Sequence, residues 1–297
     1  MIIEFSGMRS LSSNSHKMSK LLNYSIWMLV VVLYLPIFWK LYRVRWDLLD
    51  YTHAYFILPI ALWLVWRKRQ QLKALLKIAE PGKNYFGLVS LSLGILIFLF
   101  ASRFDYSFLI TLSLLPVLVG LVYSLYGIDT LKLLSFPIAY LLLLVPPPMS
   151  IIDGITLPMR YGISNLTEKI LGLLNYPITR EGLLLNIGYN EIFMGQPCSG
   201  FRSLITLFSL GLIYVYISKT RLINKVILIF FVIPLALLGN LIRVITLCLI
   251  TFYFGEEAGQ GFFHNFSGIV MFIITILGLI GIETILDKIS DQRSENS

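Results

Sequence analysis

Runs of apolar residues long enough to cross a lipid bilayer constrain the fold of this chain more than any other feature. A helix needs about 20 residues to cross a hydrocarbon core of about 30 Å. The apolar runs lie at 22–39, 54–66, 85–101, 107–126, 131–147, 200–218, 226–252 and 266–286. The sequence therefore predicts an all-α, polytopic integral membrane protein with about eight transmembrane helices.

The composition excludes several other classes of protein. Hydrophobic residues make up 57% of the 297 residues and charged residues only 13%, whereas soluble domains are about a quarter charged. This balance argues against a disordered chain, a disulfide-stapled secreted domain and a soluble nucleic-acid binder. We expect a cytoplasmic tail at 1–21, one membrane domain at 22–286 and a second cytoplasmic tail at 287–297.

The distribution of positive charge predicts the orientation in the membrane. With the N-terminus inside, the cytoplasmic segments hold fifteen Lys and Arg residues and the outer segments hold seven. Six of the fifteen fall between Arg67 and Lys83. Because cytoplasmic loops carry an excess of Lys and Arg, both termini are expected in the cytoplasm.

The segment 148–197 is expected as a loop region of about fifty residues on the outer face. Apolar residues recur at helical spacing between Ile163 and Leu174, which predicts an amphipathic helix lying at the membrane interface. Leu183, Leu185 and Ile187 then alternate with polar or small residues, which indicates a short strand.

Cys198 is a candidate nucleophile at the outer end of the apolar run 200–218. The positive end of a helix dipole favours the reactive thiolate, and Arg202 follows one helical turn later. The competing interpretation is an inert, buried cysteine. Cys248 is expected to pack in the core, although a disulfide with Cys198 is a further alternative in an oxidising compartment.

Arg243 lies inside the apolar run 226–252. Because placing a charged side chain inside a membrane costs free energy, Arg243 is a candidate functional residue. It is about 25 Å along that run, near the outer surface, so snorkelling to the headgroups is the alternative. Asn240 lies one turn earlier on the same helical face. His264 is expected on the same side of the membrane, as a base for a nucleophilic cysteine, and His53 is a competing base.

These residues resemble the exosortase/archaeosortase family of membrane transpeptidases. The resemblance rests on the segments Pro197–Ser203 and Asn240–Arg243 and on His264, in that order. The segment 51–69 is also similar to an early histidine motif of the family, and the resemblance covers roughly 40–286. Pro197 is a departure, because the family often has alanine before the cysteine.

The resemblance implies a cysteine transpeptidase of the bacterial inner membrane with its active site on the outer, periplasmic side. Its substrates would be exported proteins with a C-terminal sorting signal, made of a Pro-Glu-Pro-like motif, a membrane helix and a basic tail. Cys198 would form a thioacyl enzyme, His264 would move the proton, and Arg243 would hold the thiolate or the oxyanion. Arg202, Asn240 and His53 are supporting positions.

The expected partners are these sorting signals, membrane lipid and an unidentified acceptor nucleophile, with no nucleic acid. No cofactor or metal is expected, because the sequence has no glycine-rich phosphate loop and no zinc-type spacing of Cys and His. A metal-dependent intramembrane protease would need such ligands.

The rival function is a non-enzymatic membrane subunit for polysaccharide export or transport, with Arg243 as a counter-charge. Transporters place ionisable groups near the bilayer midplane and contain inverted repeats. Here the polar residues gather at the predicted outer face and no repeat is visible, which favours the enzyme.

Overall fold

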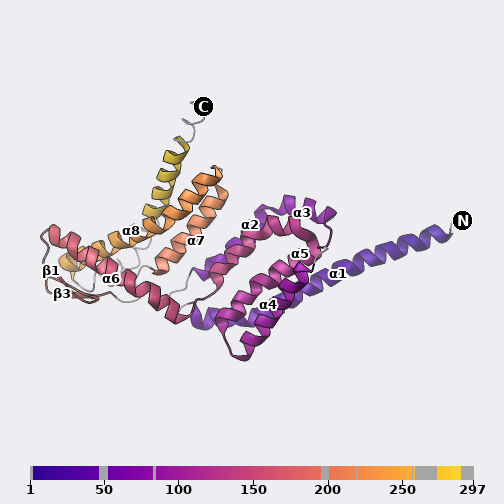
Figure 1. Ribbon diagram of the computed structural model, residues 1–297, viewed down its shortest axis with the longest axis horizontal. Helices are drawn as coiled ribbons and strands as arrows, with labels where there is room; N and C mark the ends of the chain where they lie inside the picture. Colours follow the sequence, from indigo (N-terminus) through magenta and orange to yellow (C-terminus); the bar gives the residue numbers. More distant parts are fainter. Residues whose placement is uncertain are drawn as a thin grey trace. The chain divides into compact units, whose positions relative to one another are not determined.

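A computed structural model describes residues 3–46, 53–82, 85–194, 201–218, 220–255, 257 and 273–288 (Figure 1). Among these, the side chains of 3–20, 45, 149 and 201–204 are not described. The described chain is mostly helical, as the sequence predicts. It divides into two compact units, one formed by 1–49 with 60–146 and the other by 50–59 with 147–297.

The first unit is entirely helical where it is described. Its elements, in chain order, are α1 (Ile3–Lys40), the π-helical turn η1 (Leu41–Arg45), α2 (Ala54–Arg67), α3 (Arg69–Ile78), α4 (Phe86–Arg103), α5 (Ser107–Tyr140) and the 3-10 turn η2 (Leu141–Leu144). The first six residues of α2 belong to the other unit. The Tyr34 and Ser113 hydroxyls are 2.8 Å apart and link α1 to α5.

Small residues bring α4 and α5 close together. The buried residues of α4 are Gly87, Gly94 and Ala101, which recur every seven residues along one face. Facing them is Gly120 of α5, where an added Cβ would lie 2.6 Å from the Leu91 backbone nitrogen. Helices inside a bilayer pack mainly through van der Waals contact, and small residues allow that close approach. The α4–α5 pair therefore packs through small residues, as helices inside a membrane commonly do.

Gly127 interrupts α5 and separates two helical stretches. Its φ of 78° is non-helical, and a Cβ there would lie 2.5 Å from the Glu80 carbonyl oxygen. Only glycine adopts this conformation at little cost. The interruption falls between the two apolar runs predicted at 107–126 and 131–147.

The basic segment after α2 contains a helix that the sequence analysis does not anticipate. Arg69, Lys73 and Lys77 recur every four residues along α3, while its leucines lie between them. Such a helix has one charged and one apolar face, as interfacial helices do. Lys68, just before it, donates a hydrogen bond of 3.0 Å to the Leu133 carbonyl of α5.

The second unit combines helices with a small sheet. Its elements are α6 (Met149–Leu173), β1 (Ile178–Glu181), β2 (Leu184–Ile187), β3 (Asn190–Phe193), α7 (Phe201–Ile217), α8 (Leu222–Phe254) and a further helix at 273–288. The strands form an antiparallel sheet in the order β1-β2-β3, with Leu185 opposite Arg180 and Ile192. The helix and the strand predicted in this segment are both present, although the helix begins earlier than expected, at Met149.

Among the described residues, fewer helices qualify as candidate membrane spans than the eight that the sequence predicts. Four helical segments are long and apolar enough to cross a membrane: Leu21–Val44, Phe86–Arg103, Ser107–Leu144 and Leu222–Phe254. Two further apolar segments, Ala54–Arg67 and Ile205–Ile217, are shorter. The expectation of about eight spans is therefore not confirmed, whereas the prediction of a helical membrane protein is.

Two clusters of buried residues hold the second unit together. In the first, the sheet packs with α6 and the last third of α8, through residues such as Leu171, Leu185 and Val244. In the second, α7, α8 and the helix 273–288 pack around Leu228 and Leu279. The Asn224 amide also donates a hydrogen bond of 3.1 Å to the Asp287 carboxylate.

Candidate functional site

The candidate nucleophile Cys198 lies shortly before α7 in the sequence. α7 is described from Phe201 to Ile217, so the helix predicted at 200–218 is confirmed over the described residues. Arg202 lies in α7, but its side chain is not described. Cys198 and His264 lie outside the described residues. Their arrangement relative to each other and to Arg243 therefore stays a prediction.

The predicted polar residues of α8 lie on or beside its buried face. Asn240, Val244, Cys248 and Thr251 are all buried and recur with helical spacing. Arg243 lies at the edge of the same stripe and is half-buried. Asn240 is only 1% exposed, and neither polar atom of its amide has a hydrogen-bond partner among the described residues. Together, these two residues place polar chemistry on the packed side of an otherwise apolar helix.

The length of α8 places Arg243 well along the helix. Its 33 residues span about 50 Å at 1.5 Å per residue, more than the hydrocarbon core of about 30 Å. About 20 residues counted from Leu222 reach the turn just before Arg243. The eleven residues after Arg243 include the part that packs with the sheet.

The sheet and α6 fix the last turns of α8 through several contacts. The Asn190 amide donates a hydrogen bond of 3.2 Å to the Thr251 carbonyl. The Tyr176 and Tyr253 hydroxyls are 3.0 Å apart, and this hydrogen bond raises the pKa of Tyr176. A Cβ at Gly188 would lie 3.1 Å from the Phe252 ring, so β2 and β3 turn closely over the helix.

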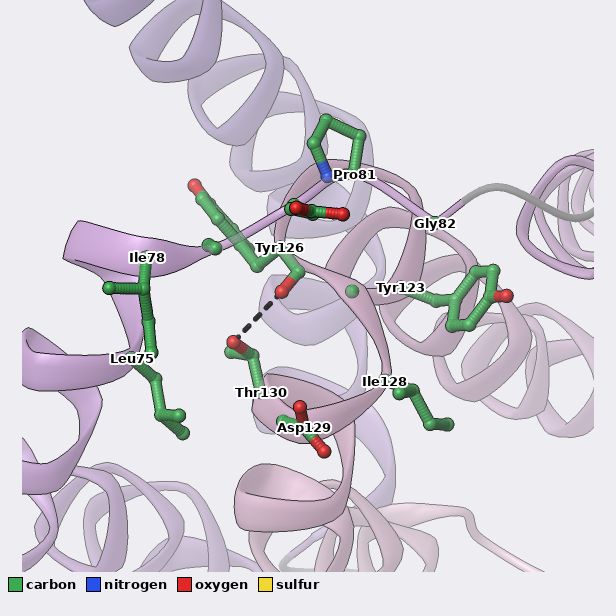
Figure 2. Close-up of a pocket in the computed structure, with 12 residues that line it drawn as sticks. Leu75, Ile78, Pro81, Gly82, Tyr123, Tyr126, Ile128, Asp129 and Thr130 are labelled. Carbon is green, nitrogen blue, oxygen red and sulfur yellow. Dashed lines mark hydrogen bonds between the residues drawn. The ribbon is translucent and has the colours of Figure 1, made fainter.

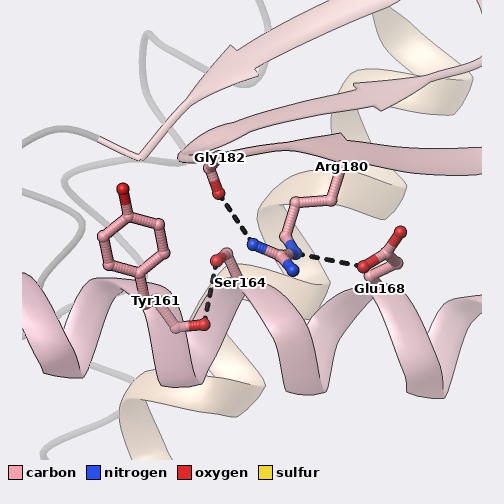
Figure 3. Close-up of polar contacts among 5 residues, drawn as sticks. All are labelled: Tyr161, Ser164, Glu168, Arg180 and Gly182. Carbon is pink, nitrogen blue, oxygen red and sulfur yellow. Dashed lines mark hydrogen bonds and ion pairs between the residues drawn. The ribbon is translucent and has the colours of Figure 1, made fainter.

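An ion pair connects the sheet to α6. Figure 3 shows the Arg180 guanidinium between the Glu168 carboxylate, at 3.1 Å, and the Gly182 carbonyl, at 2.9 Å. Arg180 lies in β1 and Glu168 in α6, and both side chains are partly exposed. A pair in such a setting stabilises by at most about 1 kcal/mol. Its main consequence is the orientation of β1 along α6.

Two further predicted residues are deeply buried. His53 lies in the turn before α2 and is 2% exposed, and its carbonyl accepts a hydrogen bond of 3.0 Å from the Phe56 amide. Cys248 is fully buried in the cluster formed by the sheet, α6 and α8. This position agrees with the packing role expected for Cys248. The alternative of a disulfide with Cys198 stays open, because Cys198 lies outside the described residues.

Sequence reasoning missed Arg160, a second arginine in a buried position. It lies in α6 and is 9% exposed, within a buried stripe that also contains Thr156, Ser164 and Thr167. These polar residues recur every three or four positions, which is the signal that could have revealed them. In the sequence, Arg160 stands out only as one of the positive charges of the segment 148–197.

The first unit contains a cavity of about 490 Å³ where α3 approaches the interruption of α5. Figure 2 shows Asp129, Tyr123 and Tyr126 in its lining. Glu80 is the second acidic residue that lines it. None of the predicted site residues lines it. Within the part of the chain that the structure describes, no group of three His, Cys, Asp or Glu residues could hold a metal ion.

Comparison with known proteins places most of the chain in one family. The family model described as transmembrane exosortase (Exosortase_EpsH) matches residues 45–281. No curated protein and no solved structure matches the chain. The matched range contains all six predicted site residues, from His53 to His264.

Proposed function

Because the chain belongs to the transmembrane exosortase family, we propose that it is a membrane-embedded cysteine transpeptidase. Its substrates are exported proteins with a C-terminal sorting signal, made of a Pro-Glu-Pro-like motif, an apolar helix and a basic tail. The substrate helix enters from the bilayer, and the bond to be cleaved lies at the outer surface of the bacterial inner membrane. The observation that carries this proposal is the family match, whose range includes Cys198, Arg243 and His264.

In the first half of the reaction, His264 takes the proton of the Cys198 thiol. The thiolate then attacks the scissile carbonyl carbon, a carbon–sulfur bond forms, and the carbonyl oxygen becomes an oxyanion. The Arg243 guanidinium stabilises that negative charge. When the oxyanion collapses, the carbon–nitrogen bond breaks, and the leaving amine takes the proton from His264. The product of this half is a thioester on Cys198.

In the second half, an acceptor nucleophile attacks the thioester and gives its proton to His264. The carbon–sulfur bond breaks, the acyl group passes to the acceptor, and the Cys198 thiol recovers its proton. Water in place of the acceptor gives hydrolysis instead of transfer. The half-buried position of Arg243 supports this scheme, because a guanidinium removed from bulk water interacts more strongly with developing charge.

The test is Cys198→Ala in cells that produce an exported protein with this sorting signal. Processing of the tail should fall to the level of a strain without the enzyme, whereas Cys248→Ala should retain processing. If Cys198→Ala removed the tail at the wild-type rate, the enzyme proposal would fail and the rival function in polysaccharide export or transport would be favoured.

A further inference from the structure

The buried stripe of α6 contains polar atoms that the described residues leave unsatisfied. Arg160 is 9% exposed, and its Nε has no hydrogen-bond partner in the described parts of the chain. The same holds for the hydroxyls of Thr156, one turn before it, and Thr167, two turns after it. These three atoms lie on one face of α6, and each can donate a hydrogen bond.

A buried arginine without an anionic partner is costly. The guanidinium is always charged in proteins, and desolvating a charge costs several kcal/mol unless it is paired. Buried polar groups are therefore almost always hydrogen-bonded in native structures. The stripe thus has the chemistry of a binding site for a ligand that carries a negative charge.

The stripe lies on the side of α6 that faces the rest of the second unit. The opposite side carries exposed apolar side chains, among them Ile151, Ile155 and Leu166. That apolar side suits contact with lipid, and it is turned away from Arg160 by the helical spacing. A ligand of Arg160 therefore binds on the side of α6 that faces the rest of the second unit, and not on the side suited to lipid.

α6 and α8 run in the same direction where they pack. The Tyr176–Tyr253 contact joins the segment just after α6 to the last turn of α8, and Ile163 and Val244 belong to the same core cluster. One turn before Ile163 is Arg160, and one turn before Val244 is Asn240. Both residues therefore lie beyond this shared core toward the same end, as Arg243 does.

We propose that Arg160 determines specificity by binding a carboxylate side chain of the substrate peptide. This inference rests on the proposed function, whose sorting signal has one acidic residue in its Pro-Glu-Pro-like motif. The planar guanidinium forms two parallel hydrogen bonds with a carboxylate. The Thr156 hydroxyl, one turn earlier on the same buried face of α6, supplies a neutral donor.

The experiment is a double-substitution cycle on the full-length protein in detergent. The probes are a synthetic peptide with a Pro-Glu-Pro motif, an apolar helix and a basic tail, and the same peptide with Pro-Gln-Pro. For the wild type, kcat/KM should be at least about tenfold lower for the Gln peptide, mainly through KM. Arg160→Met should lower kcat/KM for the Glu peptide similarly and should no longer distinguish the two peptides. Lys169→Met, which removes an exposed cation from the same helix, should leave the discrimination intact.

A second measurement separates binding from a structural role. Because Arg160→Met removes a buried charge whose Nε has no hydrogen-bond partner among the described residues, thermal stability without peptide should stay equal or rise. The Glu peptide should stabilise the wild type but not Arg160→Met. Loss of stability in Arg160→Met, or undiminished preference for the Glu peptide, would overturn the inference. So would an Arg160 effect that requires anionic lipid vesicles, because the ligand would then be a headgroup phosphate. Loss of processing in Cys198→Ala tests the proposed function independently of these outcomes.

Discussion

Two arginines have proposed roles in binding and catalysis, and they differ in how visible they are in the sequence. Arg243 interrupts a long apolar run, so its cost in a membrane identifies it at once. Arg160 lies in a segment with many polar residues, where an arginine is unremarkable. Only the structure reveals that it is buried on one face of α6.

Substitution of Arg243 tests its role in stabilising the oxyanion. Arg243→Ala should lower kcat for processing by about 10²- to 10³-fold, the usual effect of removing an oxyanion donor. Arg243→Lys should give an intermediate rate, because the charge remains while the planar fork of donors is lost. Arg103→Ala, at the exposed end of α4, serves as the control and should process normally. Equal rates for Arg243→Ala and the control would remove Arg243 from the mechanism.

At the scale of elements, hydrophobic patterning predicts where the helices lie, but it misses α3. The predicted runs correspond closely to α2, α4, α7 and α8. Charge dominates the composition of the segment containing α3, so the sequence predicts a basic loop there. Its apolar residues form a narrow stripe that only helical periodicity reveals. The helix predicted from the spacing between Ile163 and Leu174 is likewise shorter than α6, because polar residues interrupt the apolar pattern in the first half of α6.

The close packing of α4 against α5 predicts opposite effects for two glycine substitutions. Gly120→Ala should destabilise the protein by about 1–3 kcal/mol, because its Cβ would meet the backbone of α4 at 2.6–2.9 Å. Gly281 lies in the helix 273–288, and a Cβ there would meet no atom within 4 Å. Gly281→Ala should therefore stabilise the protein by up to about 1 kcal/mol, because glycine loses more conformational freedom in a helix than alanine does. Thermal unfolding in the same detergent compares the two. A stabilising Gly120→Ala would contradict the packing of α4 on α5.

At the scale of the whole molecule, the sequence predicts the class of protein and its family better than its number of spans. Apolar composition and the Cys–Arg–His set are both local properties that a single sequence displays. A span count depends on which apolar helices are long enough. In the described ranges, α2 and α7 are shorter than the four that qualify, and the first part of the predicted run 266–286 lies outside those ranges. Whether Cys198 lies beside Arg243 depends on tertiary packing, which spacing along the chain cannot determine.

Thiol labelling in intact cells tests the predicted orientation. Because Cys248 is fully buried, a membrane-impermeant maleimide should react with Cys198 from the outside, and Cys198→Ser should abolish the labelling. Labelling restricted to inverted vesicles would reverse the orientation. Labelling that appears only after reduction would favour the disulfide between Cys198 and Cys248.

The most direct test of the cysteine transpeptidase proposal is the intact mass of the protein during turnover. The purified full-length chain is incubated with the Pro-Glu-Pro peptide, without an acceptor, and quenched in acid. The mass should increase by that of the N-terminal part of the peptide, and hydroxylamine should release the adduct, as it does a thioester. Cys198→Ala should form no adduct. Cleavage of the peptide without any hydroxylamine-sensitive adduct on Cys198 would contradict the proposal.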